Sequence, residues 1–317
     1  MSKLNAIFHY SASPGIAERL RAAENDWLGI DACAEADDSR LFELLAEAEV
    51  LWHVLKPATA EVIAAAPKLR LIQKIGVGVN TIDLDAAKAR GIVVCNMPGT
   101  NSQAVAEATL LLMLAALRRA AQFHDATRQG AGWEMEAGIF DRVGELAGRT
   151  VGLVGYGAVA SRLAPVLRAL GARVLYTATA AKAEVADEWR ELDDLLAESD
   201  VISLHLPQTD ETTGLLDAAA FARMKPGAVL VNTARGGLVD EAALHDALRD
   251  GPLLAAGLDV YTEEPVAPDN PLLALENVVL MPHVAWLTPE TFQRSIAVAV
   301  ANSRCLLDGG EFQHRVI

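Results

Sequence analysis

A glycine-rich loop between a strand and a helix constrains this chain more than any other feature of its sequence. Residues 151–154 have the apolar character of a buried strand, and Gly155, Gly157 and Ala160 follow them with the spacing GxGxxA. A helical pattern and a second strand, residues 173–177, come next. This order of strand, loop, helix and strand is typical of a dinucleotide-binding βαβ unit.

Each small residue of the loop has a physical role in such a unit. Gly155 permits a tight turn, Gly157 lets a pyrophosphate approach the backbone, and Ala160 allows the helix to pack closely on the strand. The helix N-terminus offers unpaired N–H groups and the positive end of its dipole to phosphates. A plain glycine turn is the alternative, and the βαβ context disfavours it. We therefore predict cofactor contacts at Gly155, Tyr156, Gly157, Ala158 and Val159.

The end of the second strand bears on the choice between NAD and NADP. An Asp or Glu there usually accepts the ribose 2′-hydroxyl of NAD, but this chain has Ala178, flanked by Thr177 and Thr179. Without a carboxylate a 2′-phosphate meets no repulsion, and the two hydroxyls and nearby Lys182 offer donors to it. We expect NADP to be favoured and NAD to be possible. Alternatively, Thr177 and Lys182 are ordinary solvated loop residues.

Length and charge limit the other possibilities. The chain has 317 residues, and a single hydrophobic core stops growing at roughly 250–300, so two domains are expected. The formal net charge of −15 disfavours nucleic acid and anionic membrane surfaces as partners. Three widely spaced cysteines form neither a disulfide pattern nor a zinc motif, and no cleavable apolar segment follows Met1. We expect a cytoplasmic protein without a metal.

Strand-like and helix-like segments alternate along nearly the whole chain, which predicts βα units with parallel strands. A break at residues 97–99 separates a first series of units from a second one. We predict one long helix from Gln103 to about Thr127, and a last helix from about Thr288 to Leu307. The sequence thus indicates a domain of residues 98–287 inserted into a domain of residues 1–97 and 288–317.

Charged residues follow three strand-like segments of the second series. Arg235 follows residues 228–232, Asp259 and Glu264 follow residues 256–258, and His283 follows residues 277–281. Ligands of doubly wound sheets bind outside the carboxyl ends of the strands, so these side chains are expected at one crevice.

These segments resemble the signature of a known family, the D-isomer-specific 2-hydroxyacid dehydrogenases. The resemblance rests on residues 232–241, 257–265 and 282–283, and residues 76–79, 105–107, the glycine loop and 205–207 extend it in the expected order. It implies an α/β fold of two doubly wound lobes. A Rossmann-type cofactor domain would be inserted into a flavodoxin-like substrate domain.

The family's catalytic Arg, Glu and His correspond to Arg235, Glu264 and His283. The rigid fork of Arg235 suits the carboxylate of a 2-keto acid. Protonated His283 would give its proton to the carbonyl oxygen as hydride arrives from the nicotinamide. Glu264 would bond the other imidazole nitrogen, fixing the ring and favouring its charged form. A purely structural role for His283 is the alternative, which its two charged companions disfavour.

The resemblance also implies binding residues. Backbone N–H groups of Val77 and Gly78, with Lys74 nearby, would meet the substrate carboxylate together with Arg235 and His283. Asn80-Thr81 replaces the family's frequent Asp-Asn after this loop, so the local hydrogen bonds are expected to differ. Further cofactor contacts are expected at Leu206, Pro207, Thr212, Thr233, Ala234, Asp259 and Ala285. We expect His205 near the adenosine or in a structural role.

We therefore expect an NAD(P)-dependent reductase of a small 2-keto acid resembling glyoxylate or hydroxypyruvate, forming the D-2-hydroxyacid. Phosphite and phosphoglycerate dehydrogenases of the same superfamily are alternatives, although the sequence lacks the C-terminal regulatory extension of long phosphoglycerate enzymes. A redox-sensing NAD(H)-binding corepressor is another. A symmetric homodimer is expected, because apolar residues cover more than one face of the helix that begins at Gln103: Leu110, Leu111, Met113, Leu114 and Leu117.

Overall fold

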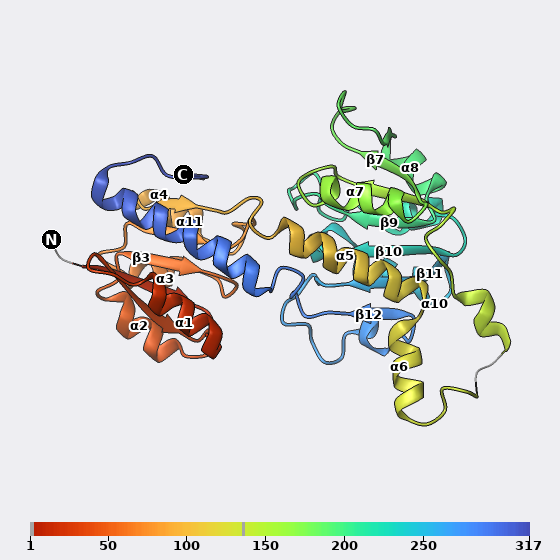
Figure 1. Ribbon diagram of the computed structural model, residues 1–317, viewed down its shortest axis with the longest axis horizontal. Coiled ribbons are helices and arrows are strands. Elements are labelled where there is room, and N and C mark those ends of the chain that lie inside the picture. Colours follow the sequence, from red (N-terminus) through yellow and green to blue (C-terminus); the bar gives the residue numbers. More distant parts are fainter. Residues whose placement is uncertain (1–2, 135–136) are drawn as a thin grey trace. The chain divides into compact units, whose positions relative to one another are not determined.

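The computed structural model describes residues 3–134 and 137–317 and divides into two compact units. Residues 1–2 and 135–136 lie outside this range, and so does the start of the N-terminal stretch in which no targeting segment is expected. One unit comprises Met1–Asn101 and Leu287–Ile317, and the other comprises Ser102–Trp286. Both are built on parallel sheets with helices, which confirms the expected α/β class (Figure 1).

The first unit contains a five-stranded sheet in the order β2-β1-β3-β4-β5, which is the flavodoxin-like order. Its strands pair in parallel. The C-terminal segment extends this sheet, because Arg315 forms an antiparallel bridge with Cys95 of β5. The elements of this unit are β1 (Leu4–His9), α1 (Pro14–Ala23), β2 (Leu28–Cys33), α2 (Asp38–Leu45), β3 (Val50–His53), α3 (Ala60–Ala64), β4 (Leu71–Lys74), α4 (Leu84–Ala89), β5 (Val93–Cys95) and α11 (Pro289–Asp308).

Helix α11 brings the end of the chain back to the first unit, where it packs against α1 and β4 (Figure 1). Its bounds follow the sequence signals closely. The Thr288 hydroxyl accepts the Thr291 N–H, Pro289 occupies the first turn, and Gly309 ends the helix with φ of 68°.

The second unit contains a seven-stranded parallel sheet in the order β12-β11-β10-β9-β6-β7-β8. The strand order reverses direction at β6, as in a Rossmann fold, so the loops after β6 and β9 flank the switch point. The elements are α5 (Ser102–Leu117), α6 (Ala120–Arg128), η1 (Ala137–Arg142), β6 (Thr150–Val154), α7 (Ala160–Ala169), β7 (Arg173–Thr177), β8 (Glu188–Trp189), α8 (Leu192–Glu198), β9 (Val201–Leu204), α9 (Ala218–Arg223), β10 (Ala228–Asn232), η2 (Gly236–Leu238), α10 (Glu241–Arg249), β11 (Leu253–Leu258), η3 (Pro271–Ala274) and β12 (Val278–Leu280).

Two apolar layers hold this sheet. Helices α5 and α7 pack on one face of it with Leu112, Leu163 and Leu167 in the layer between. Helices α8, α9 and α10 cover the other face with Leu196, Phe221 and Leu244. The strands are nearly continuous apolar runs because both of their faces are buried.

The prediction of one long helix from Gln103 to about Thr127 is wrong, because this segment forms two helices, α5 and α6. Helix α5 ends at Leu117, whose carbonyl accepts the Gly144 N–H at 2.9 Å. Arg119 then takes a left-handed conformation with φ of 49°, and α6 starts at Ala120. Neither glycine nor proline marks the break, so local sequence gave no sign of it.

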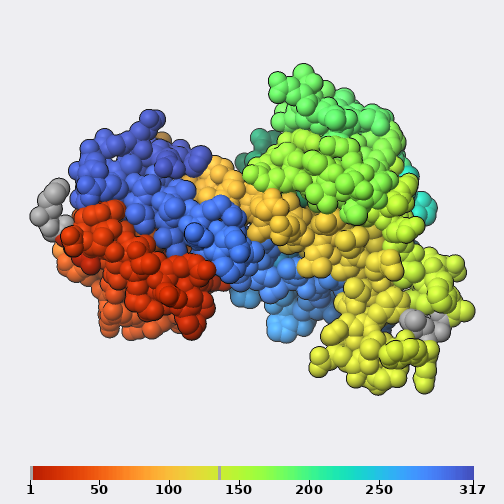
Figure 2. All heavy atoms as spheres, viewed as in Figure 1, coloured from red at the N-terminus to blue at the C-terminus, as the bar shows by residue number. Residues whose placement is uncertain are grey.

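Some of the apolar side chains of α5 remain outside the core. Leu112, Met113 and Leu117 are buried, whereas Leu111 is 57% exposed and Leu114 is 37% exposed. Figure 2 shows the surface of α5 and α6 in yellow on the visible face of this unit. Among residues 3–134 and 137–317, no helix has the length and apolar character needed to cross a bilayer.

Candidate active site

The carboxyl ends of β10, β11 and β12 bring the predicted catalytic side chains to one edge of the second sheet. These strands are neighbours and run in parallel. Arg235 follows β10, Glu264 follows β11 and His283 follows β12. Neighbouring parallel strands end at the same edge, so residues far apart in the sequence meet there.

His283 and Glu264 form a direct pair. The imidazole Nδ1 lies 2.6 Å from the Glu264 Oε2. Both side chains are partly exposed, at 24% for His283 and 33% for Glu264. A carboxylate on Nδ1 fixes the ring orientation and directs Nε2 away from the pair, which is the arrangement of an oriented general acid or base.

Glu264 is itself held in place by the loop that carries it. The Tyr261 N–H donates to its Oε1 at 2.9 Å, which leaves Oε2 for His283. Burial acts to raise the pKa of Glu264, but the hydrogen bond and charge of His283, the Tyr261 N–H and the charge of Arg235 outweigh it and lower the pKa. The carboxyl group is therefore ionised at neutral pH. This backbone contact of Tyr261 lay outside the sequence predictions.

Asp259 anchors the loop that carries His283. Its carboxylate accepts the N–H groups of Val284 at 2.8 Å and Ala285 at 3.0 Å, and its carbonyl accepts the His283 N–H at 2.7 Å. Burial raises the pKa of Asp259, and the two N–H donors act against this shift. The cofactor contacts expected of Asp259 and Ala285 stay a prediction, and both residues also take part in the hydrogen bonds of this loop.

His283 has an unusual backbone conformation. Its φ of 56° lies in the left-handed region, which costs energy for a residue other than glycine. The N–H bond to Asp259 and the bond from the Trp286 indole to the His283 carbonyl, 2.9 Å long, hold the residue there. The protein thus fixes the imidazole through the backbone as well as through Glu264.

Arg235 extends from the turn between β10 and η2. The Asn232 side chain organises this turn by donating to the Arg235 carbonyl at 2.8 Å and accepting the Ala234 N–H at 3.0 Å. Burial lowers the pKa of Arg235, and the charge of Glu264 acts in the opposite direction. A guanidinium retains its proton at any physiological pH, so the site holds a fixed, half-buried positive charge.

The two glycines after Arg235 make room for neighbouring parts of the protein. A Cβ on Gly236 would lie 1.8 Å from the Tyr261 carbonyl carbon. A Cβ on Gly237 would lie 2.3 Å from the Gln208 side chain. The glycines therefore clear room for the protein's own neighbouring loops, and they bring the Arg235 turn close to the segment that carries Glu264.

The glycine loop after β6 suits a dinucleotide. Gly155 has φ of 94°, and a Cβ there would lie 2.6 Å from the His205 carbonyl oxygen. A Cβ on Gly157 would meet no described atom within 4 Å, so the exposed loop leaves space beside its backbone. Ala158 is exposed and Val159 is half-buried ahead of α7, whose N-terminus faces this space.

His205 belongs to the framework of this loop. Its N–H donates to the Val154 carbonyl at 2.7 Å. Burial lowers the pKa of its imidazole to about 4, and Nε2 has no hydrogen-bond partner in the described part of the chain. The ring is therefore neutral at physiological pH and carries no charge to a phosphate.

The remaining predicted cofactor residues lie at strand ends or in the loops after them. Thr233 follows β10, and its hydroxyl lies 2.8 Å from that of Thr109 on α5. The Thr212 hydroxyl donates to the Pro207 carbonyl at 2.8 Å, which closes the loop after β9. Thr177 is the last residue of β7, and Ala178 and Thr179 begin the loop after it. The loop after β9 contains Leu206, Pro207 and Thr212.

The predicted substrate residues of the first unit lie at the end of β4 and in the loop after it. Lys74 is buried, and its Nζ donates to the Val54 carbonyl and contacts the Thr81 hydroxyl at 3.4 Å. The same hydroxyl lies 2.9 Å from the His53 Nε2, which replaces the local bonds expected of an Asp-Asn pair. Val77 is 43% exposed, and Gly78 follows it in the same loop.

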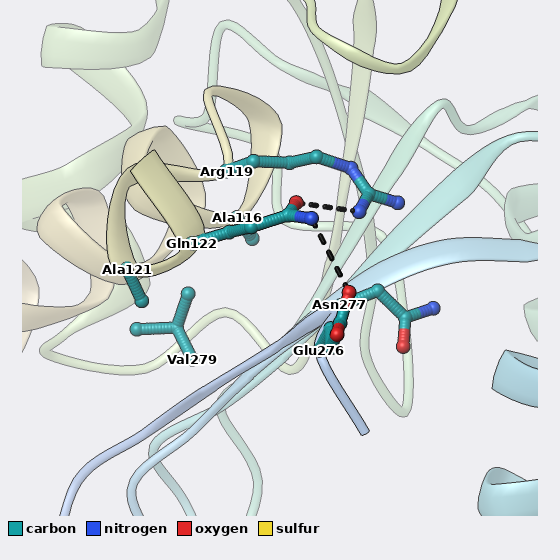
Figure 3. Close-up of a pocket in the computed structure, with 7 residues that line it drawn as sticks. All are labelled: Ala116, Arg119, Ala121, Gln122, Glu276, Asn277 and Val279. Carbon is teal, nitrogen blue, oxygen red and sulfur yellow. Dashed lines mark hydrogen bonds between the residues drawn. The ribbon is translucent and has the colours of Figure 1, made fainter. Parts of the chain in front are cut away.

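A separate small pocket lies at the opposite, amino end of β12 (Figure 3). Arg119, Gln122 and Glu276 line it, and Gln122 bonds to both of the others, at 3.0 Å to Arg119 and 3.3 Å to Glu276. It contains none of the predicted catalytic or cofactor residues. The chemistry-bearing side chains are gathered instead at the carboxyl edge.

One family model and several known proteins match this chain. The family model described as "D-isomer specific 2-hydroxyacid dehydrogenase, NAD binding domain" matches residues 110–285. The chain is 41% identical over 264 residues to a glyoxylate reductase of Aeropyrum pernix, covering 81% of this chain and 79% of that protein. It is 42% identical over 304 residues to a D-3-phosphoglycerate dehydrogenase of Mycobacterium leprae, covering 94% of this chain but 56% of that protein. The chain thus spans about half the length of the phosphoglycerate dehydrogenase.

Solved structures with similar folds bind either cofactor. A D-lactate dehydrogenase of Aquifex aeolicus, complexed with NAD and lactic acid, matches with a TM-score of 0.83 and 29% identity over 96% of each chain. An NADPH-dependent glyoxylate/hydroxypyruvate reductase of Sinorhizobium meliloti, complexed with NADP and malonate, matches with a TM-score of 0.83 and 28% identity. That match covers 99% of this chain and 97% of the other.

Proposed function

The chain belongs to the D-isomer specific 2-hydroxyacid dehydrogenase family, and from that premise we propose that it reduces a small 2-keto acid to the D-2-hydroxyacid with a nicotinamide cofactor. The observation that carries the proposal is the His283–Glu264 pair together with the half-buried charge of Arg235, which acts on Glu264. A fixed cation and an oriented proton donor are what a 2-keto acid requires during reduction.

The roles of the three side chains follow from their chemistry. Arg235 binds the substrate carboxylate through its guanidinium fork. The cofactor supplies the hydride when bound. Protonated His283 donates from Nε2 to the carbonyl oxygen, so the product forms without a free alkoxide. Glu264 orients the ring through Nδ1 and stabilises the imidazolium before the transfer. In the oxidation direction neutral His283 accepts the proton.

We propose a small, unphosphorylated substrate such as glyoxylate or hydroxypyruvate. Lys74 is engaged by the Val54 carbonyl and the Thr81 hydroxyl, and one N–H of Arg235 donates to the Ala234 carbonyl at 2.6 Å. A guanidinium has five N–H donors against the three of an ammonium, so we assign the substrate carboxylate to Arg235. One guanidinium fork pairs with one carboxylate. A glyoxylate reductase is among the relatives matched over most of both chains, which favours the same substrate class.

We propose NADPH as the preferred cofactor. Ala178 removes the carboxylate that would repel a 2′-phosphate, and the exposed Thr179 and Lys182 lie in the same loop as donors. Screening in physiological salt acts over about 8 Å, so these local groups outweigh the acidic charge of the whole chain.

The test is a turnover assay of the purified protein with NADPH or NADH and a panel of 2-keto acids that includes 3-phosphohydroxypyruvate. We expect the highest kcat/KM for glyoxylate or hydroxypyruvate with NADPH. A higher kcat/KM for 3-phosphohydroxypyruvate would refute the unphosphorylated substrate and favour the activity of a phosphoglycerate dehydrogenase. Binding of NAD(H) without turnover of any acid would favour a redox-sensing corepressor.

We also propose a cytoplasmic homodimer. The exposed Leu111 and Leu114 on α5 give an apolar surface for a second copy of the chain. Sedimentation at micromolar concentration is expected to show twice the chain mass of 33.7 kDa. A species of the chain mass alone would refute the dimer.

A further inference from the structure

A cluster of side chains around the buried Asp187 carboxylate has no part in the proposed chemistry. The Tyr156 hydroxyl donates to the Asp187 Oδ2 at 2.5 Å, and Arg168 of α7 donates to the Asp187 Oδ1. The Asp187 side chain is only 1% exposed, whereas that of Arg168 is 40% exposed. A carboxylate this deeply buried requires partners for its charge, and here a tyrosine of the glycine loop is one of them.

Asp187 also closes the loop that follows β7. This loop runs from Ala178 to Asp187, and most of its residues are exposed. It includes Thr179 and Lys182, the groups we assign to a 2′-phosphate. Asp187 is its last residue and its buried end. The glycine loop, which we assign to the pyrophosphate, and the loop after β7 are thus joined by one hydrogen bond between side chains.

Two further contacts fix the shape of the same loop. The Lys182 N–H donates to the Tyr176 hydroxyl at 2.7 Å. The Trp189 indole donates to the Ala178 carbonyl at 3.2 Å. Tyr176 in turn packs on Tyr156, with ring centroids 4.6 Å apart. The two tyrosines therefore form one aromatic support beneath both loops, and each tethers the loop after β7 through its hydroxyl.

We propose that Tyr156, Asp187 and Tyr176 are positioning residues that set the preference for NADPH by holding the loop after β7 in its phosphate-binding shape. The inference rests on the proposed cofactor preference and deepens it. The hydroxyl and carboxyl groups of these side chains act through the loop after β7, whereas the cofactor contact predicted for Tyr156 belongs to the glycine loop, which both cofactors would share. An NADH molecule lacks the 2′-phosphate, so it makes little use of the loop and depends little on the tethers.

The protonation state of Tyr156 agrees with a permanent tether. Burial and the hydrogen bond to Asp187 raise the pKa of Tyr156 to about 12. The hydroxyl therefore remains a donor throughout the physiological range.

The experiment measures dissociation constants of NADPH and NADH by fluorescence titration, which needs no turnover. Tyr156→Phe removes the hydroxyl and keeps the ring, so the aromatic support remains. We expect the Kd of NADPH to rise about fivefold or more, the factor that one lost hydrogen bond produces, and the Kd of NADH to change by less than about twofold. Tyr10→Phe, which removes a hydroxyl from the first unit, is the matched control and should change neither constant.

Tyr176→Phe is an independent test, because it removes the acceptor of the Lys182 N–H and leaves Asp187 with both partners. It too should weaken NADPH selectively. Equal weakening of both cofactors in the two variants, or no change in either, would overturn the inference while the wild-type preference stood. A wild-type preference for NADH would instead refute the proposed cofactor, and the positioning role would fall with it.

Discussion

Two loops at the carboxyl edge of the same parallel sheet are held in opposite ways. In the loop after β12, the N–H groups of His283, Val284 and Ala285 all donate to Asp259, and the Trp286 indole donates to the His283 carbonyl. The loop after β7 is mostly exposed and depends on a few side-chain tethers, among them that of Asp187.

The difference corresponds to what each loop is proposed to do. Proton transfer requires a donor at a fixed distance and angle, so the backbone around His283 is constrained even at the cost of a left-handed φ. Recognition of a 2′-phosphate by hydroxyls and an ammonium tolerates more variation. Substitutions in the first loop are therefore expected to change the chemical step, and those in the second to change the choice of cofactor.

The largest effect is expected at His283. His283→Ala removes the proton donor, and kcat for keto-acid reduction should fall about 10³-fold. The Kd of NADPH should stay close to that of the wild type, since the adenosine end is untouched. The measurement is steady-state kinetics alongside cofactor titration. His124 is an exposed histidine of α6, and His124→Gln is the control. A kcat of His283→Ala equal to that of the wild type would show that His283 is not the general acid.

Arg235→Lys should come next in size. Lysine keeps the charge but loses the planar fork, so we expect kcat/KM for the keto acid to fall about 100-fold. Arg249→Lys on α10, an exposed arginine paired with Asp250, is the matched control. Steady-state kinetics equal to the wild type would show that Arg235 does not bind the substrate carboxylate.

Glu264→Gln tests the pairing with His283 through pH. Reduction requires the imidazolium, so the rate falls as rising pH removes that proton. Burial acts to raise the pKa of Glu264, but His283, the Tyr261 N–H and Arg235 together lower it, so the carboxylate beside Nδ1 is charged. Glutamine lacks the charge that attracts the imidazolium, so the fall in rate should move to lower pH. A pH–rate profile identical to that of the wild type would contradict the pairing.

Ala178→Asp should give the smallest change in chemistry and a clear change in selectivity. The new carboxylate would repel a 2′-phosphate and accept ribose hydroxyls, so the KM of NADPH should rise about tenfold while that of NADH changes little. Lys182→Ala should weaken NADPH to a lesser degree. If the wild type clearly prefers NADH and Lys182→Ala does not change that preference, the residues after β7 do not bind a 2′-phosphate.

The contrast between the loops also marks how far sequence could predict the site. Arg235, Glu264 and His283 follow buried apolar strands, and parallel pairing alone is enough to bring such strand ends together. The partner of Tyr156 was beyond sequence reasoning, because Asp187 lies in an exposed loop with no periodic pattern. The sequence also could not show that position 236 must be glycine, because the space there is limited by the distant backbone of Tyr261. Nor could it show the helix break at Arg119, where the Gly144 N–H donates to the Leu117 carbonyl.

The separation of chemistry from cofactor choice is tested most directly by a double-mutant cycle between Glu264→Gln and Ala178→Asp. The quantity to measure is the rate of glyoxylate reduction at one NADPH concentration below the wild-type KM, in the wild type, both single variants and the double variant. Glu264 acts on the loop after β12 through its bond to His283, whereas Ala178 lies in the loop after β7. Because the two loops are held separately, the loss in the double variant should equal the product of the single losses within about twofold. A departure of about tenfold or more would show that the two loops act as one unit and would contradict the account.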